Sequence, residues 1–151
     1  MTTERPIHAE DLSVNQRFAP DGTYTVTRCE IIEFAQQWDP QAIHVDEEAA
    51  AAGYYGGLIA SGLHSLALLQ RLSVEHVLSG WANVAGSALR DARFHLPLRP
   101  DTDVRAEIVI TDIRHTRADR SNVVRRSSLI TSGGDVLVTT TIENWIRRRH
   151  R

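Results

Sequence analysis

The segment 38–46 holds the residues best suited to acid–base chemistry. Asp39 and His44 are five positions apart, and Pro40 lies between them. On one helix their side chains would point about 140° apart, and on an extended chain their Cα atoms would lie about 16 Å apart, so in neither case could both touch one water. Because Pro40 breaks a helix, a turn through Gln41 can fold His44 back beside Asp39, which would make a proton-transfer pair. The alternative, a helix-end aspartate and an ordinary loop histidine, stays open on these residues alone.

A second chemical feature is the segment 56–62, where Ser61 and Gly62 open an apolar helical stretch. The first amides of a helix have no intrahelical acceptor and lie at the positive end of the helix dipole. The Gly62 amide can therefore polarise a carbonyl oxygen on which negative charge develops. The alternative is a loop glycine with Ser61 as the helix cap. The two segments together make a stronger case for a site than either one alone.

The other reactive side chains predict no further catalytic site. Five histidines lack the spacing of metal ligands, so no metal site is expected: His8, His76, His95, His115 and His150. Cys29 is the single cysteine, which excludes an internal disulfide and a cysteine-built zinc site. All 17 basic residues are arginine, so Schiff-base chemistry on lysine is excluded. His64 is a candidate for facing the pocket, although a histidine here is more often simply a polar residue in the first turn of a helix.

Three helices are expected to position these residues. Thr27 and Glu30 form a capping box for the first helix, which should end at Asp39 because the residue before a proline avoids helical conformation. A short second helix is expected over residues 46–52. The third helix, over residues 63–78, is apolar nearly all round and is therefore expected to be buried on most of its faces.

Strand patterns occupy the second half of the chain. Four strands are expected, at residues 85–96, 104–111, 122–131 and 136–146. The second alternates apolar and charged residues from Val104 to Ile110, as a half-buried strand does. The residues 132–135 join the last two strands as a tight hairpin. One long apolar helix followed by an antiparallel sheet predicts an α+β fold, in which the sheet wraps around a long buried central helix.

The composition of the chain limits the classes of protein to which it can belong. Its 151 residues, 42% of them hydrophobic, suit one domain over residues 1–151, with a flexible N-terminal segment at about 1–10 and a solvated basic tail over 147–151. A net charge of −2 argues against a nucleic-acid binder. No apolar run approaches the roughly 20 residues of a membrane span, and the N-terminus lacks the apolar core of a signal peptide. The protein is therefore expected to be cytoplasmic, with no membrane partner.

Two motifs lie in the register of a known family. Asp39, His44 and Asp46 are followed by an Ile-Ala-Ser-Gly sequence that ends at Gly62, 18 residues after the histidine. This arrangement resembles the G-D-x-N-P-x-H-x-D and I-A-x-G signature of the MaoC-like dehydratases, which include the (R)-specific enoyl-CoA hydratases of the hotdog fold. The resemblance extends over most of the chain, from about residue 10 to residue 149. It implies a single hotdog domain.

The chain departs from that signature at several positions. Trp38 replaces its glycine, Gln41 its asparagine, and Ala42 its proline. A D-P-Q-x-x-H version is familiar in a large MaoC-like subgroup, so Gln41 can take the place of the asparagine, whereas Ala42 loosens the turn. Gln70 stands where hydratases often have a small hydroxyl residue on the central helix. These departures concern the orientation of the substrate more than the chemistry.

The resemblance implies reversible hydration of a 2-enoyl-CoA to a 3-hydroxyacyl-CoA. Asp39 and His44 would hold and deprotonate the water, and the Gly62 amide would stabilise the enolate-like oxygen. The residues expected to bind substrate are Gln41, Ser61, Tyr55, Gly57 and His64. Candidates for contacts with the coenzyme A phosphates are Arg90, Arg93, Arg114, Arg117 and Arg120. No metal or redox cofactor is implied, coenzyme A is part of the substrate, and the expected assembly is a homodimer or a dimer of dimers.

Two other functions remain as alternatives. A hotdog thioesterase would need an acidic residue on the central helix, where Glu75, near its far end, is the only carboxylate between Gly62 and Leu78. The other alternative is a non-catalytic acyl-CoA-binding hotdog subunit. The presence of both Asp39 and His44 argues against it.

Overall fold

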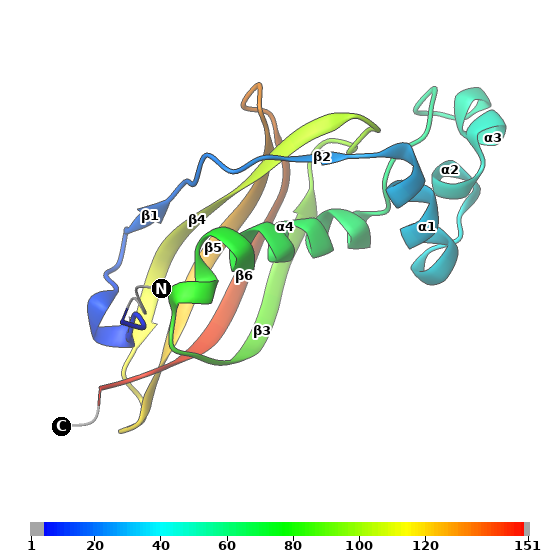
Figure 1. Ribbon diagram of the computed structural model, residues 1–151. Helices are drawn as coiled ribbons and strands as arrows, with labels where there is room; N and C mark the ends of the chain where they lie inside the picture. The colour runs from blue at the N-terminus through cyan, green and yellow to red at the C-terminus, as the bar shows by residue number, and fades with distance from the viewer. Residues whose placement is uncertain (1–4, 150–151) are drawn as a thin grey trace.

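The structure, a computed structural model, describes residues 5–149 as one antiparallel sheet that curves around a long helix (Figure 1). The α-helices are α1 (Arg28–Trp38), α2 (Ala42–Val45), α3 (Glu47–Ala52) and α4 (Gly62–His76), and short 3-10 helices lie at Ala9–Asp11 and Leu78–Gly80. The strands are β1 (Arg17–Phe18), β2 (Tyr24–Val26), β3 (Asn83–Phe94), β4 (Thr102–Arg114), β5 (Arg120–Thr131) and β6 (Val136–Arg147). Their order across the sheet is β1-β4-β5-β6-β3, and β2 also pairs with β4. The predicted α+β architecture is confirmed.

The core lies between α4 and the concave face of the sheet. From Val104 to Ile110, every second residue of β4 is fully buried, as the alternating sequence predicts. Leu69 and Leu72 of α4 belong to the same core cluster as Val104 and are 1% exposed. Burying one such leucine contributes about 2 kcal/mol to folding, so the helix is held against the sheet over several turns.

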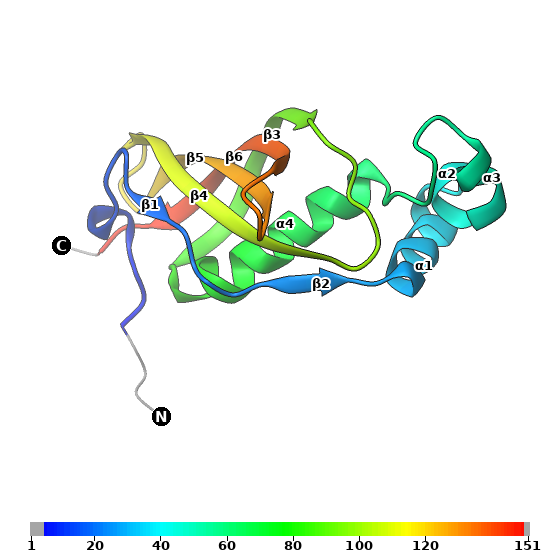
Figure 2. The same ribbon diagram turned by 90° about the horizontal axis from the view of Figure 1, so that it is seen from above.

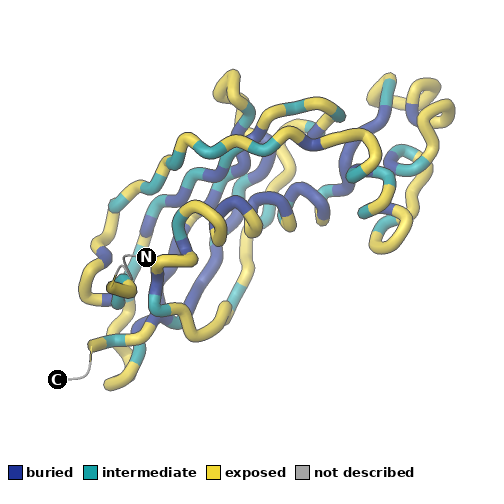
Figure 3. The backbone as a smooth tube through the Cα atoms, in the orientation of Figure 1, coloured by how far each residue is buried: buried dark blue, intermediate teal, exposed yellow. Residues whose placement is uncertain are grey.

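The prediction that α4 is buried on most of its faces is wrong for this chain. Leu63 and Val74 are 54% and 41% exposed, because the sheet covers only one side of the helix. The edge strand β3 is also largely exposed (Figure 3). Its apolar residues Val84 and Leu89 are 48% and 57% exposed. One side of α4 and the neighbouring sheet edge therefore form an uncovered apolar surface.

The helices α1, α2 and α3 gather beyond one end of the sheet, beside the start of α4, and β2 runs along α4 to reach them (Figure 2). The predicted first helix is confirmed, because the side chain of Thr27 accepts from the amide of Glu30 and the chain leaves the helix at Asp39. The predicted second helix is also confirmed as α3, whose cap is Asp46. The one-turn helix α2 was not predicted from the sequence.

Both ends of the described chain are held more firmly than the sequence analysis predicted. The amide of Ile7 donates to the carbonyl of Gly80 at 2.8 Å. Glu10 accepts hydrogen bonds from the guanidinium of Arg148 and the amide of Arg149. The segments expected to be flexible over 1–10 and solvated over 147–151 thus make hydrogen bonds at Ile7, Glu10, Arg148 and Arg149. Residues 1–4 and 150–151 lie outside the described residues.

Across residues 5–149, none of the helices combines the length and the hydropathy that crossing a bilayer requires.

Candidate active site

A tight turn after α1 brings Asp39 and His44 together. Asp39 ends α1, Pro40 follows it, and Gln41 is the cap of α2, so the chain reverses within three residues. The amide of His44 donates to the carbonyl of Gln41 at 2.9 Å, which closes the turn of α2. His44 Nε2 lies 3.5 Å from Asp39 Oδ2. The predicted folding back of His44 onto Asp39 is confirmed: Asp39 ends α1, and His44 lies in the one-turn helix α2 that follows.

Two hydrogen bonds fix the Asp39 carboxylate. Ser61 Oγ donates to Oδ2 at 2.6 Å, and Gln41 Nε2 donates to Oδ1 at 2.8 Å. These bonds, first that from Ser61 and then that from Gln41, hold the pKa of Asp39 below its ordinary value. The carboxylate is therefore ionised at neutral pH, and 21% of its side chain remains exposed to the cavity side.

The ring of His44 is oriented by a backbone carbonyl. His44 is 5% exposed, and its Nδ1 lies 2.7 Å from the carbonyl oxygen of Ile59. Because a carbonyl can only accept, Nδ1 carries the proton, and in the neutral ring Nε2 presents its lone pair toward Asp39. The segment 59–61 thus holds both members of the pair, His44 through Ile59 and Asp39 through Ser61.

Gly62 begins α4 beside this pair, and the ring of Phe94 lies directly over it. A Cβ atom at position 62 would lie 2.8 Å from two ring carbons of Phe94, closer than real Cβ contacts. Glycine is therefore needed here for close approach of an aromatic ring. Ser61 also caps the helix, because its Oγ accepts from the amide of Leu63 at 3.2 Å. The capping alternative for Ser61 is thus correct, and it coexists with the bond to Asp39.

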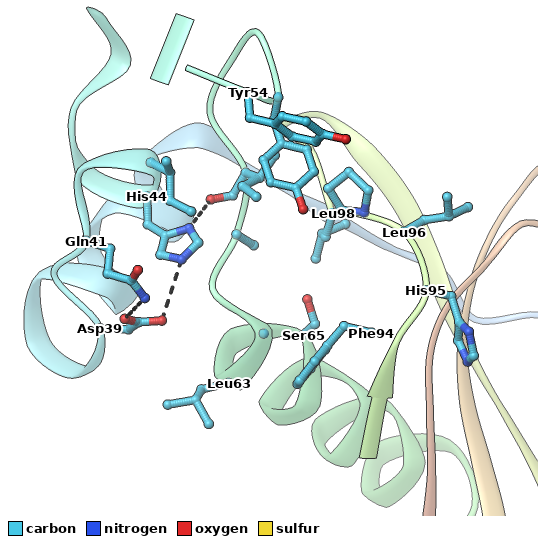
Figure 4. A pocket seen from close by; sticks show the side chains of 16 residues that line it. Asp39, Gln41, His44, Tyr54, Leu63, Ser65, Phe94, His95, Leu96 and Leu98 are labelled. Atoms are coloured by element: carbon cyan, nitrogen blue, oxygen red, sulfur yellow. Dashed lines mark hydrogen bonds and ion pairs between the residues drawn. The ribbon is translucent and has the colours of Figure 1, made fainter. Parts of the chain in front are cut away.

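These groups face a cavity of about 610 Å³. Its wall comes from the turn around Asp39 and His44, from Tyr54 and Tyr55, from the start of α4, and from the segment 94–98 (Figure 4). In Figure 4 the Asp39–His44 pair faces Phe94, Leu96 and Leu98 across the opening, with Ser65 below. A polar pair therefore stands at one side of a largely apolar pocket.

The sequence analysis missed the contribution of Phe94, Leu96 and Leu98 to this wall. Pro97 and Pro100 lie in the connection between β3 and β4, but only the path of the chain shows that this connection crosses the start of α4. The carbonyl of Leu98 accepts from the amide of Ala60 at 2.8 Å, which fixes that crossing. Tyr54, which is 96% exposed, also lines the wall, although only its neighbour Tyr55 was predicted from the sequence.

Three residues expected to bind substrate do not line the cavity. Ser61 is fully buried behind its wall, where it bonds to Asp39. His64 is not part of the cavity wall, because two positions after Gly62 a helix has turned about 200°. Its ring instead stacks on Phe34 with centroids 4.5 Å apart, and it lines a separate groove with Glu30 and Arg71. Burial lowers the pKa of His64. Gly57 also lies outside the wall, next to the guanidinium of Arg99.

The arginines proposed for phosphate contacts are mostly engaged elsewhere. Arg90 and Arg114 pair with Glu143, and Arg117 and Arg120 lie over the ring of Trp145. None of the five lines the cavity, whereas Arg99 donates to the carbonyl of Tyr55, a residue of the cavity wall, at 2.8 Å. Over the described range 5–149, no three His, Cys, Asp or Glu side chains cluster as metal ligands would.

Comparison with known proteins shows where this architecture recurs. The model of the MaoC like domain family matches residues 11–132. A MaoC-like dehydratase from Rhodospirillum rubrum is 31% identical, with a TM-score of 0.85 over 96% of this chain and 99% of that one. An (R)-hydratase from Pseudomonas aeruginosa shares the fold at 21% identity, with a TM-score of 0.77 over 95% of this chain and 88% of that one.

A curated relative, 3-hydroxyacyl-thioester dehydratase Z from Mycobacterium tuberculosis, is 40% identical over 84 residues. The match covers 54% of this chain and 56% of that protein. The chain thus spans less than two thirds of the curated relatives that it matches.

Proposed function

The chain belongs to the MaoC-like domain family, and from this premise we propose that it catalyses the reversible hydration of a 2-enoyl thioester to a 3-hydroxyacyl thioester. The observation that carries the proposal is the approach of His44 Nε2 to within 3.5 Å of Asp39 Oδ2 at the wall of the cavity. A lone pair and a carboxylate at this separation can both accept hydrogen bonds from one water molecule. The pair is therefore equipped to hold a water and to take a proton from it.

In the proposed reaction the water oxygen bonds to C3 of the enoyl group as one of its protons passes to the Asp39–His44 pair. The electron pair of the C2–C3 double bond moves toward the thioester carbonyl and gives an enolate-like oxygen. The pair then returns one proton to C2, which regenerates the carbonyl and completes the addition of one water. The reverse sequence is dehydration. Because the two groups share one proton, they act as a unit.

The amide of Gly62 is the group proposed to stabilise the enolate-like oxygen. It lies at the N-terminus of a 15-residue helix and lines the same cavity as the pair. A donor held rigidly by a helix needs no reorganisation when negative charge develops, which is the source of its advantage over water. The ring of Phe94, packed over Gly62, would limit the access of bulk water to that oxygen.

The substrate proposed is a coenzyme A thioester, and no metal or redox cofactor has a step in this scheme. The name of the tuberculosis relative, a 3-hydroxyacyl-thioester dehydratase, supports the reaction class. Glu75, the carboxylate that a thioesterase mechanism would need, pairs with Arg71 on the exposed side of α4 and does not line the cavity. The geometry therefore favours water addition over thioester cleavage.

The same proposal includes a homodimer. The edge strand β3 exposes Leu89 and Phe94, and α4 exposes Leu63 beside them. An unpaired strand edge next to apolar surface is usually covered by another chain, most often through a two-fold axis. Sedimentation should give twice the 16.9 kDa mass of the chain, and a stable monomer at micromolar concentration would contradict this part of the proposal.

The activity is tested with a panel of 2-enoyl-CoA thioesters of graded length and branching. Hydration is measured as the loss of the absorbance of the conjugated double bond. Released thiol is measured in parallel on the same samples. Loss of absorbance without thiol release is the expected result. Thiol release with the double bond intact would indicate a thioesterase, and activity on no member of the panel would favour a non-catalytic binding subunit.

A further inference from the structure

Arg125 occupies an unusual position for an arginine. It lies in the middle of β5, between Ile110 of β4 and Ile142 of β6, on the face of the sheet that α4 covers. Its exposed fraction is 0%. Placing a guanidinium in such a position costs several kcal/mol unless an opposite charge compensates it.

The structure provides Arg125 with neutral partners only. Nε donates to Asn144 Oδ1 at 3.1 Å, Nη1 donates to Ser127 Oγ, and Nη2 donates to Gln70 Oε1 at 3.2 Å. Within residues 5–149 these three acceptors are all uncharged, so the arginine has no carboxylate partner there. Burial lowers the pKa of Arg125 to about 10, so the group keeps its charge at neutral pH.

Two of those neutral partners face a cavity. Gln70 and Asn144 line a space of about 400 Å³ between α4 and β3, together with Thr140, Leu66 and Leu69. Gln70 is exposed, and its 3.2 Å bond to Arg125 is the long end of the usual range. A swing of the Gln70 side chain would therefore open the guanidinium to this second cavity.

The second cavity follows the first along α4. Ser65 lines the cavity of the Asp39–His44 pair, and Leu66, the next residue, lines the second one. Both cavities also use β3, the first through Phe94 and the second through Leu89. Gly62 and Gln70 are separated by about 12 Å along the helix axis. An acyl chain whose thioester carbonyl lies at Gly62 would thus run along α4 toward Gln70.

We propose that Arg125 binds a carboxylate at the far end of the acyl chain, so that the preferred substrates are thioesters of dicarboxylic acids. The ligand carboxylate would take the place of Gln70 Oε1 as the acceptor for Nη2 and would supply the missing negative charge. Thr140 and Asn144 would add polar contacts beside an otherwise apolar channel. This inference rests on the proposed function for the position of the thioester, and it names the substrate class of that site.

Binding of saturated thioesters tests this inference separately from catalysis, because they have no double bond to hydrate. Isothermal titration calorimetry would compare suberoyl-CoA with octanoyl-CoA, which has the same chain length and a methyl terminus. We expect the wild-type protein to bind suberoyl-CoA at least about tenfold more tightly, the effect of one or two charge-assisted hydrogen bonds. Equal affinities, tighter octanoyl-CoA binding, or binding of neither thioester would overturn the inference.

Three variants assign the preference to Arg125. Arg125→Met should remove the preference for suberoyl-CoA and leave octanoyl-CoA binding within about threefold, because a buried charge can often be replaced by an apolar side chain of similar size. Arg126→Met is the matched control, since Arg126 is the exposed neighbour on the opposite face of β5. It should keep the preference. A preference that survives in Arg125→Met, or that is lost equally in Arg126→Met, would contradict the assignment.

Gln70→Glu keeps the test decisive if Arg125→Met does not fold. The new carboxylate would pair with Arg125 and compete with the ligand carboxylate, so suberoyl-CoA should bind at least about tenfold more weakly and the ratio of suberoyl-CoA to octanoyl-CoA affinity should fall. Unchanged suberoyl-CoA binding in Gln70→Glu would overturn the inference. Failure of the proposed function is seen separately, as absence of water addition to 2-enoyl thioesters by a protein that still discriminates between the two saturated ones.

Discussion

The two polar sites beside α4 differ in the exposure of their charged group and in the partners that this group has. At the start of the helix, Asp39 receives hydrogen bonds from Ser61 and Gln41 and remains partly exposed. About 12 Å further along the helix axis, beside Gln70, Arg125 of β5 is fully buried and has only neutral acceptors among residues 5–149. A carboxylate that takes part in proton transfer is best positioned when its hydrogen bonds are already made before the substrate binds. A guanidinium that recognises an anion contributes most binding free energy when the ligand itself supplies the opposite charge. The comparison therefore distinguishes a site that carries out the reaction from a site that determines which substrate binds.

The largest effect is expected from variants that remove the catalytic side chains and leave the Arg125 site intact. Asp39→Asn and His44→Ala should each lower kcat/KM for enoyl-CoA hydration by at least about 100-fold, the lower range for general acid–base catalysis. Both should keep the wild-type ratio of suberoyl-CoA to octanoyl-CoA affinity. Hydration is measured by the enoyl absorbance and affinity by calorimetry.

Folding of these variants needs its own control. Asp39→Asn keeps an acceptor for Ser61, whereas His44→Ala leaves the Ile59 carbonyl without its donor, at a cost of about 1–3 kcal/mol in the free energy of unfolding. Thermal melts should show folded protein in both cases. Full hydratase activity in folded His44→Ala would move the site of chemistry elsewhere.

A smaller effect is expected from Gly62→Ala. The new Cβ would meet the ring of Phe94 at 2.8 Å, and because Phe94 is 55% exposed its ring can swing aside at little cost in stability. The displaced ring would alter the wall beside the proposed oxyanion donor, so kcat/KM should fall by about tenfold. Gly62→Ala combined with Phe94→Leu should recover part of the loss. If the double variant recovers nothing, the ring is not the cause.

Ser61→Ala should change the pH dependence more than the rate at neutral pH. Loss of the Ser61 hydrogen bond, the largest cause of the lowered pKa of Asp39, raises that pKa. The acidic limb of the kcat/KM profile, where the carboxylate becomes protonated, should therefore move to higher pH. Ser65→Ala is the control, because Ser65 lines the cavity but bonds to the backbone of Ser61. An acidic limb that stays in place in Ser61→Ala would contradict the role assigned to this hydrogen bond.

The smallest effect is expected at His64, a histidine of α4 that lines neither of the two cavities. His64→Phe should change kcat/KM by less than about twofold, since Phe retains the stacking on Phe34. It also removes the buried Nδ1, which has no hydrogen-bond partner among the described residues. A loss of activity comparable with that of His44→Ala would show that the assignment of cavities along α4 is wrong.

The local part of this arrangement could be predicted from the sequence. Pro40 fixed the end of a helix, the Thr27–Glu30 pair fixed its start, and the spacing of Asp39 and His44 required a turn between them. The alternation from Val104 to Ile110 gave the buried face of β4. Each of these signals depends on residues within a few positions of one another, where backbone geometry alone limits the outcome.

The non-local part could not be predicted in the same way. Arg125 meets Gln70, 55 residues away, only because the register of β5 with β4 and β6 points its side chain under α4. A strand pattern with arginines at 125 and 126 does not say which one faces the helix. His64 was misplaced for a related reason, since its position on the helix became meaningful only once the direction of the cavity was known.

The central claim is that Asp39 and His44 act as one unit on one water molecule, and the double variant Asp39→Asn/His44→Ala tests it most directly. The measurement is kcat/KM for hydration in the wild type, the two single variants and the double variant, with folding checked by thermal melts. Members of one catalytic unit are strongly non-additive, so the double variant should lie within about threefold of the less active single variant. A double variant whose loss equals the product of the two single losses would show that the residues act independently and would contradict the account.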